Sequence, residues 1–124
     1  MMGRDETIHA FWSSFGVPAF DENTTPTGAP YPRITYDVVD GSSWGSEVAM
    51  SAMIHSKSTS WREAVDIKNA ISKYLGDSGK QFDCDGGSIW IKKADPFATR
   101  TGTSEDDTVR QYLINISIEN HIFE

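Results

Sequence analysis

The feature that most constrains the fold is a long alternating run late in the chain, from Val109 to Phe123. Its apolar side chains recur at every second residue: Tyr112, Ile114, Ile116 and Ile118. A period of two places these side chains on one face of a β-strand. A strand of this length with one apolar face needs strands beside it and a layer packed against that face. We therefore predict a central or long closing strand in a mainly antiparallel sheet.

The remaining periodicity predicts two helices and shorter strands. The first helix ends at Gly16 and carries an apolar stripe of Ile8, Phe11, Trp12 and Phe15. The second runs to about Leu75, after a capping box with Ser60 as N-cap and Glu63 at the third helical position. Strands are predicted over 33–39, 48–55, 82–84 and 89–92. The order predicts an α+β fold, with a mainly antiparallel sheet of about five strands and two helices packed on one face.

Length and loop pattern predict a single domain. A chain of 124 residues buries on the order of two-thirds of its surface on folding, which is enough for one core but not for two. Three connections, over 17–33, 40–47 and 94–108, are long and have no period of their own. Loops of this kind usually carry function. We therefore predict one domain over 1–124 with its functional surfaces on these loops.

Charge and cysteine content limit the partners. Eighteen acidic residues against 11 basic ones give a net charge of -7, the opposite of the balance typical of domains that grip duplex DNA. Cys84 is the single cysteine, so neither an intrachain disulfide nor a multi-cysteine zinc site is possible. The opening residues lack the apolar run of a signal peptide, and no stretch approaches about 18 apolar residues. We therefore expect a protein made in a reducing cytoplasm, with no membrane partner.

One string has the form of a catalytic motif. Gly41–Gly45 matches the G-x-S-x-G pattern of a nucleophile elbow, with Ser43 at its centre. That motif needs a strand before it and a helix after it, whereas a strand is predicted to follow here. We therefore interpret the string as the tip of a hairpin.

Acidic residues offer a possible cation site. Asp83, Asp85 and the run Glu105–Asp107 have the oxygen ligands that a divalent cation prefers. The spacing of a calcium-binding loop is absent, and the two groups lie in different predicted turns. A solvated acidic surface is the favoured interpretation, and a cation that bridges two subunits stays open.

The histidines and the cysteine do not form a recognisable site. His9, His55 and His121 are scattered, and no pair has the i, i+4 spacing of helical metal ligands. Cys84 lies beside two acids, which raise the pKa of a thiol, and is expected to be a small buried apolar side chain. We therefore predict no catalytic residue, no metal and no cofactor.

Two aromatic positions point instead to contacts with other proteins. Trp44 lies on a polar hairpin tip, and Phe97 follows Pro96 at the start of a polar loop. Exposed aromatic side chains are favoured anchors of interfaces, and each can alternatively fold back over the edge of the core. The interface candidates are Trp44, Pro96, Phe97, Arg100, Glu105, Asp106 and Asp107.

Several short strings are spread along nearly the whole chain: the opening Met1–Glu6, the pair Phe11–Trp12, then Pro32–Tyr36, Ser58–Trp61, and Asp85–Gly87 before Ile89–Ile91. Together they resemble the tail terminator, or tail-completion, proteins of long-tailed bacteriophages of Gram-positive hosts. The genes of this family lie between head-completion and tail-tube genes. Trp44 departs from the family pattern, because a small polar residue is expected at that hairpin tip.

The resemblance implies a structural virion protein with an α+β fold and no catalytic residues. Such proteins form a hexameric ring that caps the tail tube, stops its polymerisation and joins it to the head connector, or stopper. The implied partners are copies of itself, the tail-tube protein and the head–tail connector, assembled in the host cytoplasm. DNA passes through the lumen without specific binding, which suits an acidic protein. We expect some of Glu105, Asp106 and Asp107 to face the lumen or a neighbouring subunit.

Three alternatives stay open. The chain is also compatible with a neighbouring head–tail connector or minor capsid protein. A small metal-dependent hydrolase would use Ser43 or the acidic loops, and a monomeric adaptor would hold a host protein through Trp44 and Phe97. A ring predicts a particle several-fold heavier than the 13.8 kDa chain.

Overall fold

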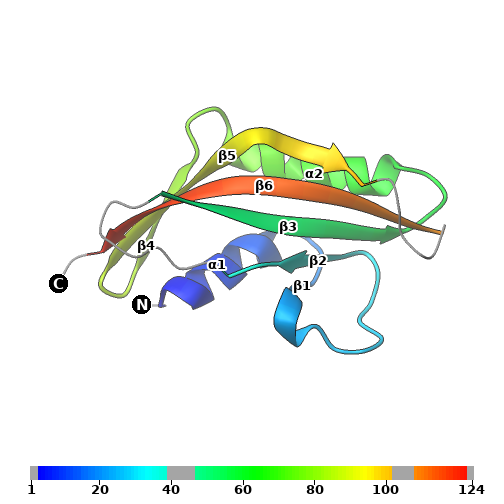
Figure 1. Ribbon diagram of the computed structural model, residues 1–124, viewed down its shortest axis with the longest axis horizontal. Coiled ribbons are helices and arrows are strands. Elements are labelled where there is room, and N and C mark those ends of the chain that lie inside the picture. The colour runs from blue at the N-terminus through cyan, green and yellow to red at the C-terminus, as the bar shows by residue number, and fades with distance from the viewer. Residues whose placement is uncertain (1–2, 39–46, 102–107, 123–124) are drawn as a thin grey trace.

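The computed structural model describes residues 3–38, 47–101 and 108–122 (Figure 1). Within these residues two helices and six strands follow one another: α1 (Arg4–Trp12), β1 (Ala19–Asp21), β2 (Arg33–Tyr36), β3 (Glu47–Lys57), α2 (Arg62–Leu75), β4 (Lys80–Cys84), β5 (Gly87–Arg100) and β6 (Val109–Ile122). Short 3-10 turns follow α1 and β1, at Ser13–Phe15 and Glu22–Thr24.

The strands form one sheet in the order β1-β2-β3-β6-β5-β4. All neighbours are antiparallel except β1 and β2, which run parallel. The long alternating run is β6, and it lies between the two other long strands, β3 and β5. The predicted α+β class and the central place of this strand are confirmed, with six strands in the described sheet.

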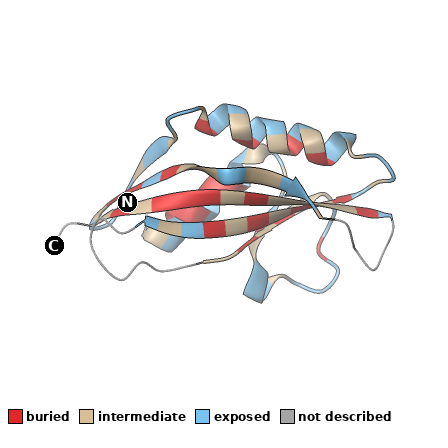
Figure 2. Ribbon diagram, turned by 45° about the horizontal axis from the view of Figure 1, so that its top comes forward, coloured by how far each residue is buried: buried red, intermediate tan, exposed pale blue. Residues whose placement is uncertain are grey.

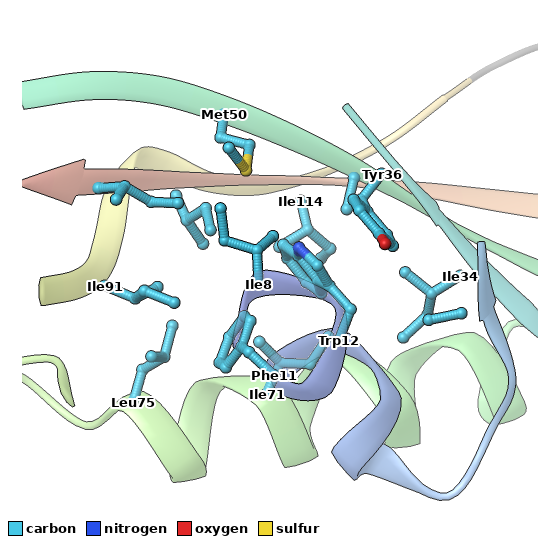
Figure 3. Packing of buried hydrophobic residues seen from close by; sticks show 14 of the residues in the cluster. Ile8, Phe11, Trp12, Ile34, Tyr36, Met50, Ile71, Leu75, Ile91 and Ile114 are labelled. Carbon is cyan, nitrogen blue, oxygen red and sulfur yellow. The ribbon is translucent and has the colours of Figure 1, made fainter. Parts of the chain in front are cut away.

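Both helices cover the same face of the sheet, and the core lies between these two layers (Figures 2 and 3). In Figure 3 the side chains of α1 and α2 point toward those of the sheet. The fully buried large side chains are Ile8, Trp12, Ile34, Met50, Ile54, Ile71, Leu75, Ile89, Ile91, Ile114, Ile116 and Ile118. The apolar face predicted for β6 is therefore the face that the helices bury.

Helix α1 ends close to the predicted position. Its last turn tightens into the 3-10 turn Ser13–Phe15, and Gly16 follows with a left-handed φ of 81°. Glycine adopts this conformation without the steric cost that a side chain brings. Phe15 packs against the core from this turn, so the whole predicted stripe is used.

Helix α2 begins differently from the prediction. It starts at Arg62, and no side-chain capping bond involves its N-cap residue, Trp61. Ser60 accepts a hydrogen bond from the Arg62 amide (3.1 Å), but Glu63 accepts one from the Ser56 hydroxyl on β3 (2.6 Å). The predicted capping box is therefore wrong. Ser56 is fully buried, and a buried hydroxyl needs a partner, which Glu63 supplies.

Two of the predicted loops contain strand. The loop predicted over 94–108 is wrong in its first half, because β5 continues to Arg100 through a shift in register between Lys93 and Ala98. Such a bulge breaks the period of two that reveals a strand, and Pro96, which cannot donate to a sheet, lies inside it. The loop predicted over 17–33 contains the three-residue strand β1, which is too short to show any period.

Candidate assembly surfaces

The structure places only part of the predicted interface residues. Trp44 lies in 39–46, and Glu105, Asp106 and Asp107 lie in 102–107, so all four are outside the described residues, as is Ser43. Pro96, Phe97 and Arg100 lie in the second half of β5.

Phe97 packs against the edge of the core. Its ring is half-buried, and the Lys93 Nζ atom lies 5.4 Å from the ring centroid. The neighbouring carbonyl of Pro96 accepts a hydrogen bond from the Asn115 side-chain amide (3.2 Å), which holds the bulge against β6. Pro96 itself is exposed. In the isolated chain Phe97 thus folds back over the edge of the core, which was the second of the two interpretations of this residue. Pro96 faces outward.

Arg100 is exposed, and its guanidinium lies near two aromatic rings at the end of β5. Its guanidinium carbon is 4.7 Å from the centroid of Trp61 and 5.9 Å from that of Tyr112. These two rings meet edge to face, with centroids 5.9 Å apart. A cation–π contact of this kind contributes about 0.5–1 kcal/mol at an exposed site.

Other basic side chains gather at the same end of the sheet. Register places the ends of β3 and β5 beside the start of β6, and α2 begins after the turn that follows β3 (Figure 1). We call this cluster the basic end: Arg33, Lys57, Arg62, Arg100 and Arg110. Arg33 also lies over an aromatic ring, with its guanidinium carbon 4.3 Å from the centroid of Tyr31.

The opposite end of the sheet is acidic. The start of β3, the last part of β6 and the β4–β5 turn lie there, and a hydrogen bond from Arg4 to Asn120 (2.8 Å) fixes the start of α1 beside them. We call this cluster the acidic end: Asp5, Glu6, Glu47, Asp83, Asp85 and Glu119. The acidic end also holds Arg4 and Lys92, which pair with Asp5 and Glu47, so the described carboxylates cluster there without excluding basic side chains.

The sheet face opposite the helices carries a network of polar side chains. Ser51 donates to the side-chain oxygen of Asn115 (2.9 Å) across the β3–β6 pair. Ser117 donates to Glu47 (2.5 Å), and Lys92 lies 3.2 Å from the same carboxylate. The Ser117 hydrogen bond and the Lys92 charge lower the pKa of Glu47. This open face is thus hydrogen-bonded across three strands, and neither described helix covers it.

His55 is the titratable group most affected by this face. Its Nδ1 faces the side-chain nitrogen of Gln111 (3.3 Å), which is a donor, so Nδ1 accepts and the proton of Nε2 points to the Thr35 hydroxyl (2.9 Å). Burial and the nearby charge of Arg33 lower the pKa of His55 to about 4. The neutral ring is therefore the form that fits the folded protein.

Folding should weaken in acid because of His55. In the unfolded chain the ring titrates near about 6.5, whereas in the folded chain its pKa is about 4, so the unfolded state binds more protons between these values. We expect the His55 contribution, up to about 3 kcal/mol, to be lost as the pH falls from about 6.5 to about 4. Urea unfolding of the native chain and of His55→Gln measures it. An equal acid loss in both proteins would contradict this assignment.

The other candidate cysteine, histidine and carboxylate side chains have contacts or positions that belong to the structure of the protein. Cys84 is buried as predicted, and burial is the main cause that raises the pKa of its thiol. His9 bonds the Tyr36 hydroxyl (2.8 Å), and Asp83 and Asp85 lie at the acidic end. Within the described ranges, no three histidine, cysteine or carboxylate side chains come together as metal ligands.

A small hollow of about 110 Å³ lies on the open face. Glu22, Asp37, Ser51, Met53 and Leu113 are among its lining residues. A hydrogen bond with Asp37, supported by the charge of that carboxylate, raises the pKa of Glu22.

No protein-family model and no curated protein matches the chain. Neither α1 nor α2 has the length and apolar character needed to cross a membrane, and this holds for the described residues.

Proposed function

We propose that this chain is a structural virion protein of the tail terminator type, which forms a ring on the end of a phage tail tube and joins it to the head connector. The observation that carries the proposal is the fold. The family that the sequence strings resemble has helices packed against a sheet, and here both described helices pack against one face of a mainly antiparallel sheet. The resemblance therefore gains support from a property on which it did not depend.

The distribution of surfaces also suits a ring. A ring joins its subunits head to tail, so each subunit needs two different patches. The basic end and the acidic end are two such patches on opposite ends of one rigid sheet. The open face lies between them and carries its polar side chains in hydrogen bonds. A ring of this kind would carry DNA past an acidic protein without gripping it.

Disruption of the gene in its native genome tests the function. A terminator stops the growth of the tube, so its loss should give tubes of unregulated length and heads without tails. Electron microscopy of the resulting particles measures both properties. Supply of the chain from a plasmid is the matched control and should restore tubes of one length. Tubes of normal length joined to heads in the disrupted strain would overturn the proposal.

The same images separate the neighbouring possibilities. Loss of a head–tail connector would leave tubes of normal length that fail to join heads, and loss of a minor capsid protein would alter the heads. A hydrolase acting through Ser43 would instead lose its role in Ser43→Ala, a change that should leave a terminator unaffected.

A further inference from the structure

Strand β4 lies at one edge of the sheet and has a neighbour, β5, on one side only among the described strands. Cys84 and Gly87 pair across the two-residue turn between β4 and β5, so their backbone groups bond to each other in both directions. Every second residue of β4 bonds to β5 in this way. The backbone N–H and C=O groups of Gln81 and Asp83 therefore point to the free side, and no group of the described residues bonds to them there.

A hollow of about 400 Å³ lies beside this free edge. Its lining includes Gln81, Phe82 and Asp83, three successive residues whose side chains alternate between the two faces of the sheet. A hollow on one face would contact every second residue, so this one meets β4 from its edge. Helix α1 and the turn after it bound the other side through Thr7, Ala10, Phe11 and Ser14. Space for an added strand thus exists next to the backbone groups that such a strand needs.

The inner wall of the hollow is aromatic. Tyr74 stacks on Phe82, with 6.4 Å between the ring centroids, and Phe11 meets Phe82 edge to face at 5.8 Å. Tyr74 is still 41% exposed, so its ring is available for a further contact. Phe82 points to the helix-covered face of the sheet, and the residue opposite it in an added strand would point the same way, into the hollow. An aromatic or branched apolar side chain is the type that fits there.

Two charges on β4 define what flanks that apolar residue. Asp83 and Lys80 are both exposed, and the Lys80 Nζ atom lies 5.8 Å from the ring centroid of Tyr74, on the side of the hollow. Opposite charges directly across two strands are favourable, and like charges are unfavourable. In an antiparallel strand, the more stable arrangement, the residue opposite Asp83 comes just before the apolar residue and the one opposite Lys80 comes two after it. The complementary order is therefore basic, apolar, any residue, acidic.

We propose that the free edge of β4 binds an extended segment of a partner protein by strand addition, with an apolar side chain in the hollow and charges in this order. A second copy fits less well, because pairing of β4 with its own copy about a two-fold axis would bring both α1 helices to one face of the junction. The other edge of the sheet offers less, since β1 has three residues and the Asp21 carbonyl already accepts the Thr25 hydroxyl (3.0 Å). The inference goes beyond the proposed function and does not depend on it.

Peptide binding to two variants of one residue tests the backbone contact. The probe is the fluorescein-labelled peptide TKFTEV, with the other positions of its apolar residue (leucine, isoleucine or valine) as a panel. Gln81→Pro removes the outward N–H, a substitution that edge strands tolerate. Gln81→Ala is the matched control, because it also loses the side-chain bond to Ser88 (3.1 Å) but keeps the N–H. We expect binding at least about tenfold weaker to Gln81→Pro and near native to Gln81→Ala. Fluorescence anisotropy measures this, with circular dichroism to confirm folding.

Charge exchange tests the order of the flanking residues. Asp83→Lys should bind TKFTEV about fivefold more weakly than the native chain does, and it should bind TEFTEV about fivefold more tightly. Lys73→Glu, an exposed change near the end of α2 and outside the hollow, is the matched control and should bind both peptides like the native chain.

Hydrogen exchange of the backbone amides gives a readout that needs no substitution. In the free chain the outward amides of Gln81 and Asp83 should exchange fast, whereas those of Phe82 and Cys84, which bond to β5, should exchange slowly. A saturating concentration of TKFTEV should slow the two outward amides and leave the other two unchanged. Nuclear magnetic resonance of the native chain measures all four.

Several results would overturn the inference. These are a panel in which no peptide binds, equal binding to Gln81→Pro and Gln81→Ala, or outward amides that TKFTEV does not slow. Outward amides that are slow in the free chain, and slower at higher protein concentration, would assign the edge to a second copy. Binding of N-acetylphenylalanine amide as tight as that of the peptide would assign the hollow to a small aromatic molecule. Tubes of normal length in the disrupted strain would remove the proposed function and leave this strand site standing, whereas failure of the peptides would do the reverse.

Discussion

Replacing Trp12 by alanine should cost the fold about 3–5 kcal/mol, a large part of the stability of a domain of this size. Trp12 is fully buried where α1 meets the sheet, with its ring stacked on Tyr36 (6.4 Å between centroids) and edge to face with Phe11 (4.8 Å) (Figure 3). Removal of the ring leaves a cavity that the neighbouring rings cannot fill. Urea unfolding followed by circular dichroism measures the loss.

The phenylalanine variant provides the matched control. The Trp12 indole nitrogen is buried, and no acceptor lies within hydrogen-bonding distance in the described chain. An unsatisfied buried donor costs about 1–3 kcal/mol, and Trp12→Phe removes it together with part of the ring. We expect this variant to lose less than half of what Trp12→Ala loses. Equal losses would mean that the indole nitrogen makes a stabilising hydrogen bond and that the volume of the ring does not decide stability.

Replacing Gly79 by alanine should cost about 2–4 kcal/mol, the second large effect. Gly79 has a left-handed φ of 77°, and a Cβ atom there would lie 2.4 Å from the Ile91 carbonyl oxygen and 2.7 Å from the Trp90 indole nitrogen. That indole donates to the Ser78 carbonyl (2.7 Å) and holds the turn between α2 and β4. The added methyl group therefore strains the backbone and displaces β5.

Gly28→Ala separates these two causes. Gly28 has the same φ of 77°, but no atom lies within 4 Å of the position its Cβ would take. It should cost only the backbone term, about 1–2 kcal/mol. Thermal unfolding of both variants checks the comparison, and similar losses would show that the close approach of Gly79 to β5 has no energetic weight.

The periodicity of the apolar residues predicted those helices and strands that have one buried face and one exposed face along their length. The run from Val109 is the clearest case, because a central strand has a helix-covered face and an open face along its whole length. Periodicity did not predict the features that depend on contacts between residues far apart in the sequence. The Glu63 side chain accepts a hydrogen bond from the serine buried on β3 instead of capping its own helix. The bulge at Pro96 breaks the period of two, so the second half of β5 is not recognised as strand. Nothing local in the sequence announces either contact.

The surfaces were harder to predict than the fold. Arg100 was a candidate from its loop, but Trp61 and Tyr112, on which it lies, come from other elements and were expected only in the core. In the structure Lys57, Arg100 and Arg110 all lie at or near the ends of strands, whereas the sequence placed Arg100 inside a predicted loop. Only the register shows that these ends meet on one side, so clustering of charge required the topology and not the composition.

The central position of β6 has a consequence for biosynthesis. The strand that lies between β3 and β5 is made after both of them, so neither can complete its place in the sheet until β6 has left the ribosome. The pairing of Lys57 with Val109 must close the whole segment between them, and such distant contacts form slowly. The two parts of the sheet on either side of β6 therefore join only after β6 has been made.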